Sequence, residues 1–223
     1  MVDLHPPLAI GPDLGGPGVL ADDFFRIAHS DSTGRPRLHT RAAGVGLGGA
    51  LLAELVLDRQ LTIEDGQLVV VDRQPPDDAL AHTVLEQLVA EPHHRKVRTW
   101  LDFLSRTAPE AVGDRLVRAG HATRRTSRWR RGAFFVPTDM SAAAWPEARL
   151  RMLLTGRGRW TWPDVVLVGL VSATGLASQV LWDVEPATRA HRAEVLGWLA
   201  PDLHELVAQT EAAVGDAVLS HRT

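Results

Sequence analysis

The stretch of residues 165–182 carries no charged side chain, and this feature constrains the fold more than any other. Its eighteen residues approach the length of a helix that crosses a bilayer. However, serine and threonine residues interrupt it, and Asp164 and Asp183 flank it where a membrane helix would carry basic anchors. We therefore predict a buried central helix that ends near Gly175, with the rest of the chain packed around it.

Composition narrows the chemistry that the chain can perform. The 223 residues include no Cys and no Tyr, and Lys96 is the only lysine. Disulfides, thiolate metal sites and a Cys nucleophile are therefore excluded, and lysine chemistry has one candidate residue. A content of 45% hydrophobic and 23% charged residues is typical of a soluble globular protein, and the length allows one domain with a sizeable core.

Apolar periodicity and turn residues predict a mostly α fold, a single multi-helix domain around the central uncharged helix, with two small β-hairpins. The other helices are expected at about 19–29, 47–57, 77–90, 95–105, 109–119, 186–199 and 202–219. One hairpin is expected around Glu64-Asp65-Gly66 and the other over residues 121–136, with its turn at Ser127-Arg128.

Residues 1–17 are rich in proline and glycine, and they lack the basic and apolar regions of a signal peptide. We expect a mostly disordered lead-in there, followed by the single domain over residues 18–223.

The segment Gly44-Val45-Gly46-Leu47-Gly48-Gly49 satisfies the G-x-G-x-x-G pattern of dinucleotide-binding folds. That pattern needs a preceding strand and an alternating βαβ chain. Here residues 37–41 are mostly polar and basic, and no doubly wound pattern follows. We therefore interpret the glycines as a helix start that permits close packing, and we expect no nucleotide cofactor.

No pattern in the sequence favours an enzyme. His93-His94 is the densest histidine cluster, but no helix carries a histidine pair four residues apart with a carboxylate between them, so no metal site is expected. A G-x-S-x-G nucleophile motif is absent, and no paired carboxylates stand out. The prediction is a binding protein without a metal or cofactor.

Charge is distributed unevenly along the chain. Residues 93–131 contain 11 Lys and Arg against 3 acids, a net charge of +8, whereas the whole chain has a net charge of -3. Such segregation indicates an anionic partner, either nucleic acid or a membrane surface. The alternative is a solvated basic face that the acidic remainder of the chain balances.

Two arginine groups provide candidate phosphate ligands. The first comprises Arg35, Arg37 and Arg41, before the second helix. In the second group, Arg106 directly precedes Thr107, which is expected to open a helix through a capping box. An arginine beside a helix N-terminus is a natural phosphate site, although the capping glutamate would compete for the same amides.

The hairpin expected over residues 121–136 interleaves arginines with Trp129, Phe134 and Phe135. Such a hairpin can press into an anionic bilayer, with aromatic rings in the interface and arginines on head groups. It can also be the wing of a winged helix, because two expected helices precede it. A third possibility is that the phenylalanines pack partly inward and the arginines are only solvated.

The chain resembles the Golgi phosphoprotein 3 family, whose bacterial members are common in actinobacteria, and its arginine-heavy composition agrees with such a source. The resemblance rests on the block from Gly46 to Leu57 followed by a short hairpin, on the helix Asp77–Leu88, and on Leu116–Gly120 with its hairpin. It implies a single, mostly α domain that binds phosphatidylinositol 4-phosphate at a basic patch and inserts a neighbouring hairpin into the membrane.

The resemblance also implies site residues. The family's lipid pocket has a Trp and three Arg, and these positions fall on His39, Gly48, Arg106 and Pro109, so that Arg106 alone is kept. The expected ligands of an anionic head group are His39, Arg41 and Arg106. The expected membrane-contacting hairpin residues are Arg128, Trp129, Arg130, Arg131, Phe134 and Phe135.

These residues lead to the expectation of a peripheral protein on the inner, cytoplasmic face of the membrane. Its partner would be an anionic phospholipid or phosphoinositide surface, with a protein cargo as a possible further partner. A nucleic-acid-binding protein with a winged-helix-like segment and a protein–protein adaptor with an acidic partner are the alternatives.

Overall fold

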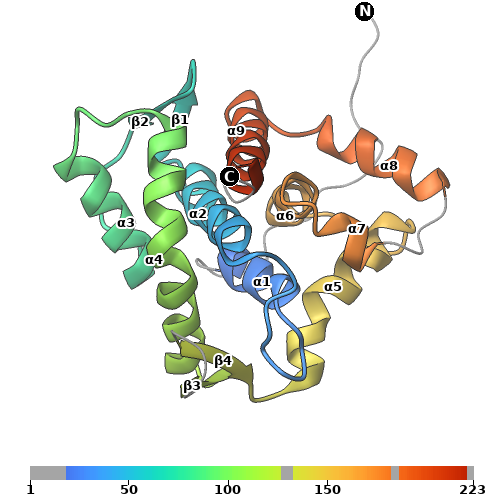
Figure 1. Ribbon diagram of the computed structural model, residues 1–223. Helices are drawn as coiled ribbons and strands as arrows, with labels where there is room; N and C mark the ends of the chain where they lie inside the picture. The colour runs from blue at the N-terminus through green and yellow to red at the C-terminus, as the bar shows by residue number, and fades with distance from the viewer. Residues whose placement is uncertain (1–18, 127–132, 182–185, 220–223) are drawn as a thin grey trace, which may run out of the picture.

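The structure is a computed structural model and describes residues 19–126, 133–181 and 186–219. The predicted lead-in and the tip of the second hairpin lie outside the described residues. Within them the chain forms a single, mostly helical domain with two small hairpins, as predicted (Figure 1). The helices are α1 Val19–Ala28, α2 Thr40–Leu57, α3 Ala79–Ala90, α4 Val97–Arg118, α5 Met140–Leu154, α6 Trp162–Ala173, α7 Ala177–Val180, α8 Pro186–Leu196 and α9 Pro201–Leu219.

Helix α6 is the central uncharged helix that the sequence predicts. It opens with a capping box, in which the Thr161 hydroxyl and the Asp164 carboxylate each bond the backbone of the other residue. It ends just before Gly175, whose φ of +79° suits glycine at a helix C-terminus. The helix is buried over nearly its whole length because α1, α2, α8 and α9 pack around it.

Helix α2 is longer than expected, since it begins at Thr40 rather than at residue 47. The glycine run therefore lies inside the helix and not at its start, which corrects the predicted boundary. The close packing that we predicted is confirmed: a Cβ atom on Gly44 would lie 2.1 Å from the carbonyl oxygen of Ser105 in α4. Close contact with α4 compensates the low helix propensity of glycine.

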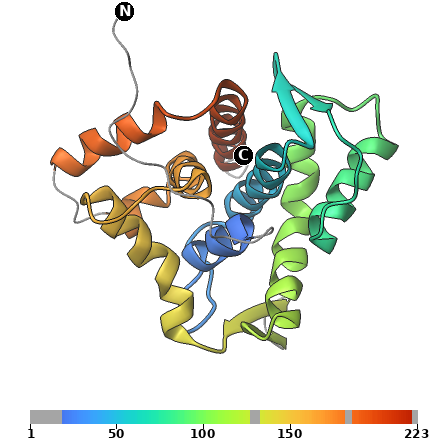
Figure 2. The ribbon, with the colours of Figure 1, turned by 180° about the vertical axis from the view of Figure 1, so that it is seen from behind.

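The length and composition of α2 would also suit a membrane span, with a mean hydropathy of 1.4. In the structure 83% of this helix is buried inside the protein. It contacts α1, α4, α6 and α9, and it carries much of the hydrophobic core. Figures 1 and 2 show α3 and α4 on one side of this centre and α5, α7 and α8 on the other.

The two helices predicted over residues 95–119 are one continuous helix, α4, with Pro109 in its interior. The predicted helix start at Thr107 is therefore wrong. Proline cannot donate to the carbonyl four residues earlier, which belongs to Ser105. That same carbonyl faces Gly44 of α2, so the defect is covered by a close helix contact. The two short helices on which the winged-helix alternative was based are therefore a single helix in the described residues.

The hairpins form where the sequence places them. Strands β1 Leu61–Glu64 and β2 Gln67–Val70 pair antiparallel through a turn at Asp65-Gly66, both of which have positive φ. Strands β3 Ala122–Thr126 and β4 Ala133–Pro137 form the second hairpin. Both views show this hairpin at the lower end of the molecule, between the end of α4 and the start of α5 (Figure 2).

Helix α5 has no counterpart among the predicted elements. Asp139 caps it by accepting hydrogen bonds from the backbone amides of Ser141 and Ala142. Its interior contains Pro146, and its first half contains few large apolar residues, so the periodic signal in the sequence is weak.

Candidate anion-binding surface

Arg41 and Arg106 converge on one carboxylate. A guanidinium nitrogen of Arg41, in the first turn of α2, donates to one oxygen of Asp102 at 2.7 Å. Arg106, one turn further along α4 than Asp102, donates to the other oxygen at 2.7 Å. The side chains of Arg41 and Arg106 are exposed, and that of Asp102 is partly exposed. We call these residues the double-arginine cluster; its formal net charge is +1.

His39 lies at the same helix end. Its Nδ1 atom accepts a hydrogen bond from the backbone amide of Arg41 at 3.3 Å, so that the imidazole caps α2. The first turn of α2 contains no acidic residue. The positive end of the helix dipole therefore lies next to the double-arginine cluster, and the three predicted head-group ligands occupy one surface.

The structure also shows why the other two family positions are not arginine ligands here. Gly48 is buried, and a Cβ atom there would lie 3.0 Å from the Leu104 side chain, which leaves no room for a long residue. Pro109 lies in α4, three residues after Arg106. Arg41 thus supplies the second guanidinium at this surface.

The predicted setting of Arg106 requires a correction. Arg106 lies in the middle of α4, so no helix N-terminus is formed beside it by its own helix. The nearby helix start is that of α2. Arg41 in its first turn and Arg106 of α4 both bind Asp102, and this shared carboxylate brings Arg106 close to the start of α2. Sequence spacing could not show this arrangement because it depends on how α2 and α4 pack.

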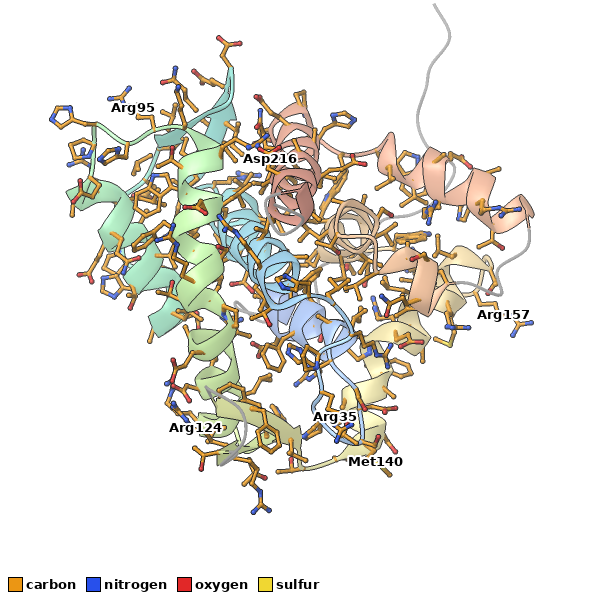
Figure 3. The ribbon with its side chains drawn as sticks, in the orientation of Figure 1. Arg35, Arg95, Arg124, Met140, Arg157 and Asp216 are labelled. Carbon is orange, nitrogen blue, oxygen red and sulfur yellow. The ribbon has the colours of Figure 1, made fainter. Side chains whose placement is uncertain are left out.

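The C-terminal end of α9 borders the cluster. Arg98 forms an ion pair with Asp216 of α9. Arg98, Asp102 and Arg106 follow one another at four-residue spacing and therefore share one face of α4. Figure 3 shows Asp216 between α4 and α9. This face of α4 is consequently ordered by contacts from both neighbouring helices.

The register of the second hairpin separates its two phenylalanines. Phe135 pairs with Arg124 and Phe134 pairs with Arg125, so each pair projects from a different face of the hairpin. Phe135 is only 6% exposed, and its ring packs edge-on against that of Phe25, with 5.9 Å between the two ring centroids. Phe135 is therefore a core residue, which corrects its predicted role as a membrane contact.

The opposite face of the hairpin carries Phe134 and Arg125. Phe134 is half-buried beside the exposed Arg125. Arg125 and the nearby exposed Arg118 have no carboxylate partner among the described residues. The predicted contacts Arg128, Trp129, Arg130 and Arg131 lie outside the described residues.

Part of the basic segment is neutralised within the protein. Arg124 bonds Asp114 and Glu110 on the surface. Arg115, which the sequence counts as one more basic residue, is buried and contacts three carboxylates, namely Asp22 at 2.7 Å, Asp78 at 2.9 Å and Glu54 at 3.4 Å. We call this group the Arg115 network. A charge count alone cannot distinguish such an internal residue from a surface ligand.

Burial controls protonation in the Arg115 network. Burial raises the pKa of Glu54 from 4.5 to about 7, although Arg115 and the Ala21 amide oppose the shift. Burial also raises the pKa of Asp22, and it raises that of the neighbouring Asp23 to about 6. Burial of Glu54 disfavours its charged form more than the guanidinium of Arg115 favours that form, so folded Glu54 keeps its proton to about pH 7.

We expect the free energy of unfolding to fall by about 2 kcal/mol between pH 5 and pH 8, since one pKa unit corresponds to about 1.4 kcal/mol. Unfolded Glu54 loses its proton near pH 4.5, whereas folded Glu54 keeps it to about pH 7, so stability is lost as the pH rises through this window. Urea unfolding at several pH values measures how steeply the free energy of unfolding falls with pH. Glu54→Gln imitates the protonated side chain and should make this pH dependence weaker. An unchanged pH dependence in the variant would show that Glu54 is not its cause.

We also searched the described part of the chain for a metal site and for a ligand pocket. No group of three or more metal-ligating side chains occurs there. A small pocket lies at the base of the second hairpin, between the end of α1 and the start of α5, with Phe25, His29 and Phe135 in its wall. The double-arginine cluster is thus the surface with the clearest chemical preference, which is for an anion.

Comparison with known proteins identifies the family. The model of the Golgi phosphoprotein 3 (GPP34) family matches residues 20–210, which cover nearly all of the described domain. A comparison with curated proteins gives no match to the chain. The matched region contains α2 with its glycine run and the Arg115 network, as well as the double-arginine cluster. The chain therefore belongs to the Golgi phosphoprotein 3 family.

Proposed function

We propose that this protein is a non-enzymatic peripheral membrane protein that binds anionic lipid head groups, of the phosphatidylinositol 4-phosphate type, on the cytoplasmic face of a membrane. The observation that carries the proposal is the convergence of Arg41 and Arg106 on Asp102 beside the N-terminus of α2. His39 and Arg106 occupy positions of the family's lipid pocket, and Arg41 adds a second guanidinium next to them.

The chemistry of this cluster suits a phosphate group. Guanidinium groups bind phosphate through paired hydrogen bonds, and a phosphate monoester carries more negative charge than one carboxylate. In the free protein Asp102 holds both guanidiniums in place, so an arriving phosphate would exchange with this carboxylate for the same donors. Binding therefore needs no large rearrangement of α2 or α4.

The second hairpin would supply the contact with the bilayer itself. Its outer face presents Arg125 and Phe134, and Arg118 lies exposed at the adjacent end of α4. Arginines near an anionic surface contribute on the order of 1 kcal/mol each, and an aromatic ring favours the interfacial region. The outer face of the hairpin thus combines both kinds of contact.

Removing both arginines of the cluster is expected to weaken binding to anionic vesicles roughly 30-fold, since two contributions of ~1 kcal/mol are lost. The experiment compares wild type with Arg41→Ala/Arg106→Ala in co-sedimentation with phosphatidylcholine vesicles containing phosphatidylinositol 4-phosphate or, at equal charge, phosphatidylserine. Asp102→Asn should bind several-fold tighter than wild type, because it releases both guanidiniums.

The control variant Arg189→Ala/Arg192→Ala removes the same charge from α8, on the other side of the molecule (Figure 1). It should bind as wild type does. Equal loss in both double variants would show only a general charge effect and would contradict a site at Asp102. A gel shift with DNA that depended on Arg41 and Arg106, without vesicle binding, would favour the nucleic-acid alternative.

A further inference from the structure

Helix α5 exposes large apolar side chains. Met140 is 60% exposed, Trp145 is 52% exposed and Met152 is 39% exposed. Trp145 and Met152 are seven residues apart, and the exposed Ala148 lies between them, so these residues share one face of the helix. The opposite face buries Leu150 and its neighbours in the core. Neighbouring elements therefore cover only one face of α5.

The segment that contains this face is basic. Residues 148–163 include four arginines and no acidic residue. Asp164 binds Arg149 through two hydrogen bonds of 2.7 Å, and Glu147 pairs with Arg151. The exposed Arg157 and Arg159 that follow the helix have no carboxylate partner among the described residues. Figure 3 shows Arg157 projecting away from the body of the protein.

The exposed face also adjoins the second hairpin. Strand β4 ends at Pro137 and α5 begins at Met140, so the hairpin leads directly into the helix. Figure 3 shows Arg124 of the hairpin, Arg35 and Met140 at the same lower end of the molecule. Arg35 is exposed as well. A surface with apolar and cationic side chains thus extends from the hairpin to α5.

We propose that the outer face of α5, formed by Trp145 and Met152, together with Met140 at the start of the helix and Arg157 and Arg159 beyond its end, is a second membrane-contacting surface that lies in the head-group region of an anionic bilayer. Tryptophan and methionine would enter the interface while the free arginines meet lipid phosphates. The charge of the segment and its continuity with the hairpin favour a bilayer as the occupant. The proposal rests on the proposed function. It adds a fixed orientation of the protein on the membrane, because a second contact at α5 prevents rotation about the hairpin.

Because the chain contains no cysteine, a dye can be attached at single introduced cysteines to test whether this surface contacts the membrane. Single cysteines introduced as Trp145→Cys, Met152→Cys, Thr126→Cys in the hairpin and Ala190→Cys on α8 would carry an environment-sensitive nitrobenzoxadiazole dye. With vesicles of phosphatidylcholine and phosphatidylserine, we expect a blue shift and protection from aqueous iodide at positions 145, 152 and 126. The dye at position 190 should stay accessible.

A second variant tests the contribution to binding. Trp145→Ala/Met152→Ala should weaken vesicle binding roughly tenfold, since it removes two partly inserted apolar side chains. Its melting temperature should stay near that of wild type, because both side chains are exposed. Unchanged vesicle binding by this variant would overturn the proposal.

The outcomes separate this proposal from the proposed function. If the dye at position 126 shifts but those at 145 and 152 remain accessible, the α5 surface is overturned while lipid binding stands. If no dye shifts and wild type does not sediment with any vesicle, both are overturned. If the dyes at 145 and 152 shift without vesicles and light scattering shows a doubled mass, α5 is a self-association surface and the proposal is overturned.

Discussion

Arg115→Ala is expected to lower the free energy of unfolding by about 3–5 kcal/mol at pH 7, as removal of one partner from a buried charge group does. Arg115 binds Asp22 and Asp78 at 2.7 and 2.9 Å, and it lies 3.4 Å from the buried Glu54. Without it, three carboxylates from α1, α2 and the start of α3 would face one another with no cation. The pKa of Arg115 is raised above its usual value by these carboxylates despite its burial, so the guanidinium stays charged.

Urea unfolding measures this effect, and Arg118→Ala is its matched control. Arg118 lies one turn later on the same helix, is exposed, and has no carboxylate partner in the described part of the chain, so its loss should change stability by less than about 0.5 kcal/mol. The deficit of Arg115→Ala should also shrink at pH 5, where Glu54 is protonated in the folded state. If Arg115→Ala lowers the free energy of unfolding by no more than Arg118→Ala does, the Arg115 network does not stabilise the fold.

Gly44→Ala is expected to destabilise the protein by about 1–3 kcal/mol, the usual range for overpacking a close contact. The added methyl group would lie 2.1 Å from the Ser105 carbonyl oxygen, which is backbone and cannot rotate away. The helices α2 and α4 would have to separate, and the Ser105 carbonyl is the group that Pro109 leaves without its helical donor. The steric cost therefore exceeds the gain in helix propensity.

Gly215→Ala provides the control for helix propensity. Gly215 lies in α9 with no neighbouring atom within 4 Å of an added Cβ, so the same substitution should stabilise the protein by up to about 1 kcal/mol. Thermal unfolding of the two variants should thus move in opposite directions. A stabilised Gly44→Ala variant would disprove the proposed role of close α2–α4 packing.

The block from Gly46 to Leu57, which carries much of the family resemblance, builds the core. Gly46 makes room for the ring of Phe24, and Gly49 makes room for Thr210 of α9. Glu54 accepts a hydrogen bond from the Ala21 amide and contacts Arg115. The candidate ligands lie outside this block. The resemblance of this block to the family therefore rests on residues that hold the fold, whereas the proposed anion-binding residues lie on the surface.

Several elements could be predicted from the sequence because local physics determines them. The first half of the uncharged stretch 165–182, which is strongly apolar, forms most of the buried central helix α6, and this helix ends just before Gly175, as predicted. Asp65-Gly66 adopts the positive φ values that a tight turn needs, and it produced the first hairpin. The density of apolar residues at helical spacing was enough to predict the mostly α class.

Other features were decided only by tertiary structure, because the energy that fixes them comes from residues distant in the sequence. Pro109 and a capping pattern predicted a helix boundary, but the fit of Gly44 against Ser105 favours one continuous helix. The burial of Phe135, in contrast to the partial exposure of Phe134, follows from strand register, which composition does not reveal. The approach of α2 to α4 likewise gives Arg41 and Arg106 a shared carboxylate and places Arg115 among three others, so packing alone separates the surface arginines from the buried one.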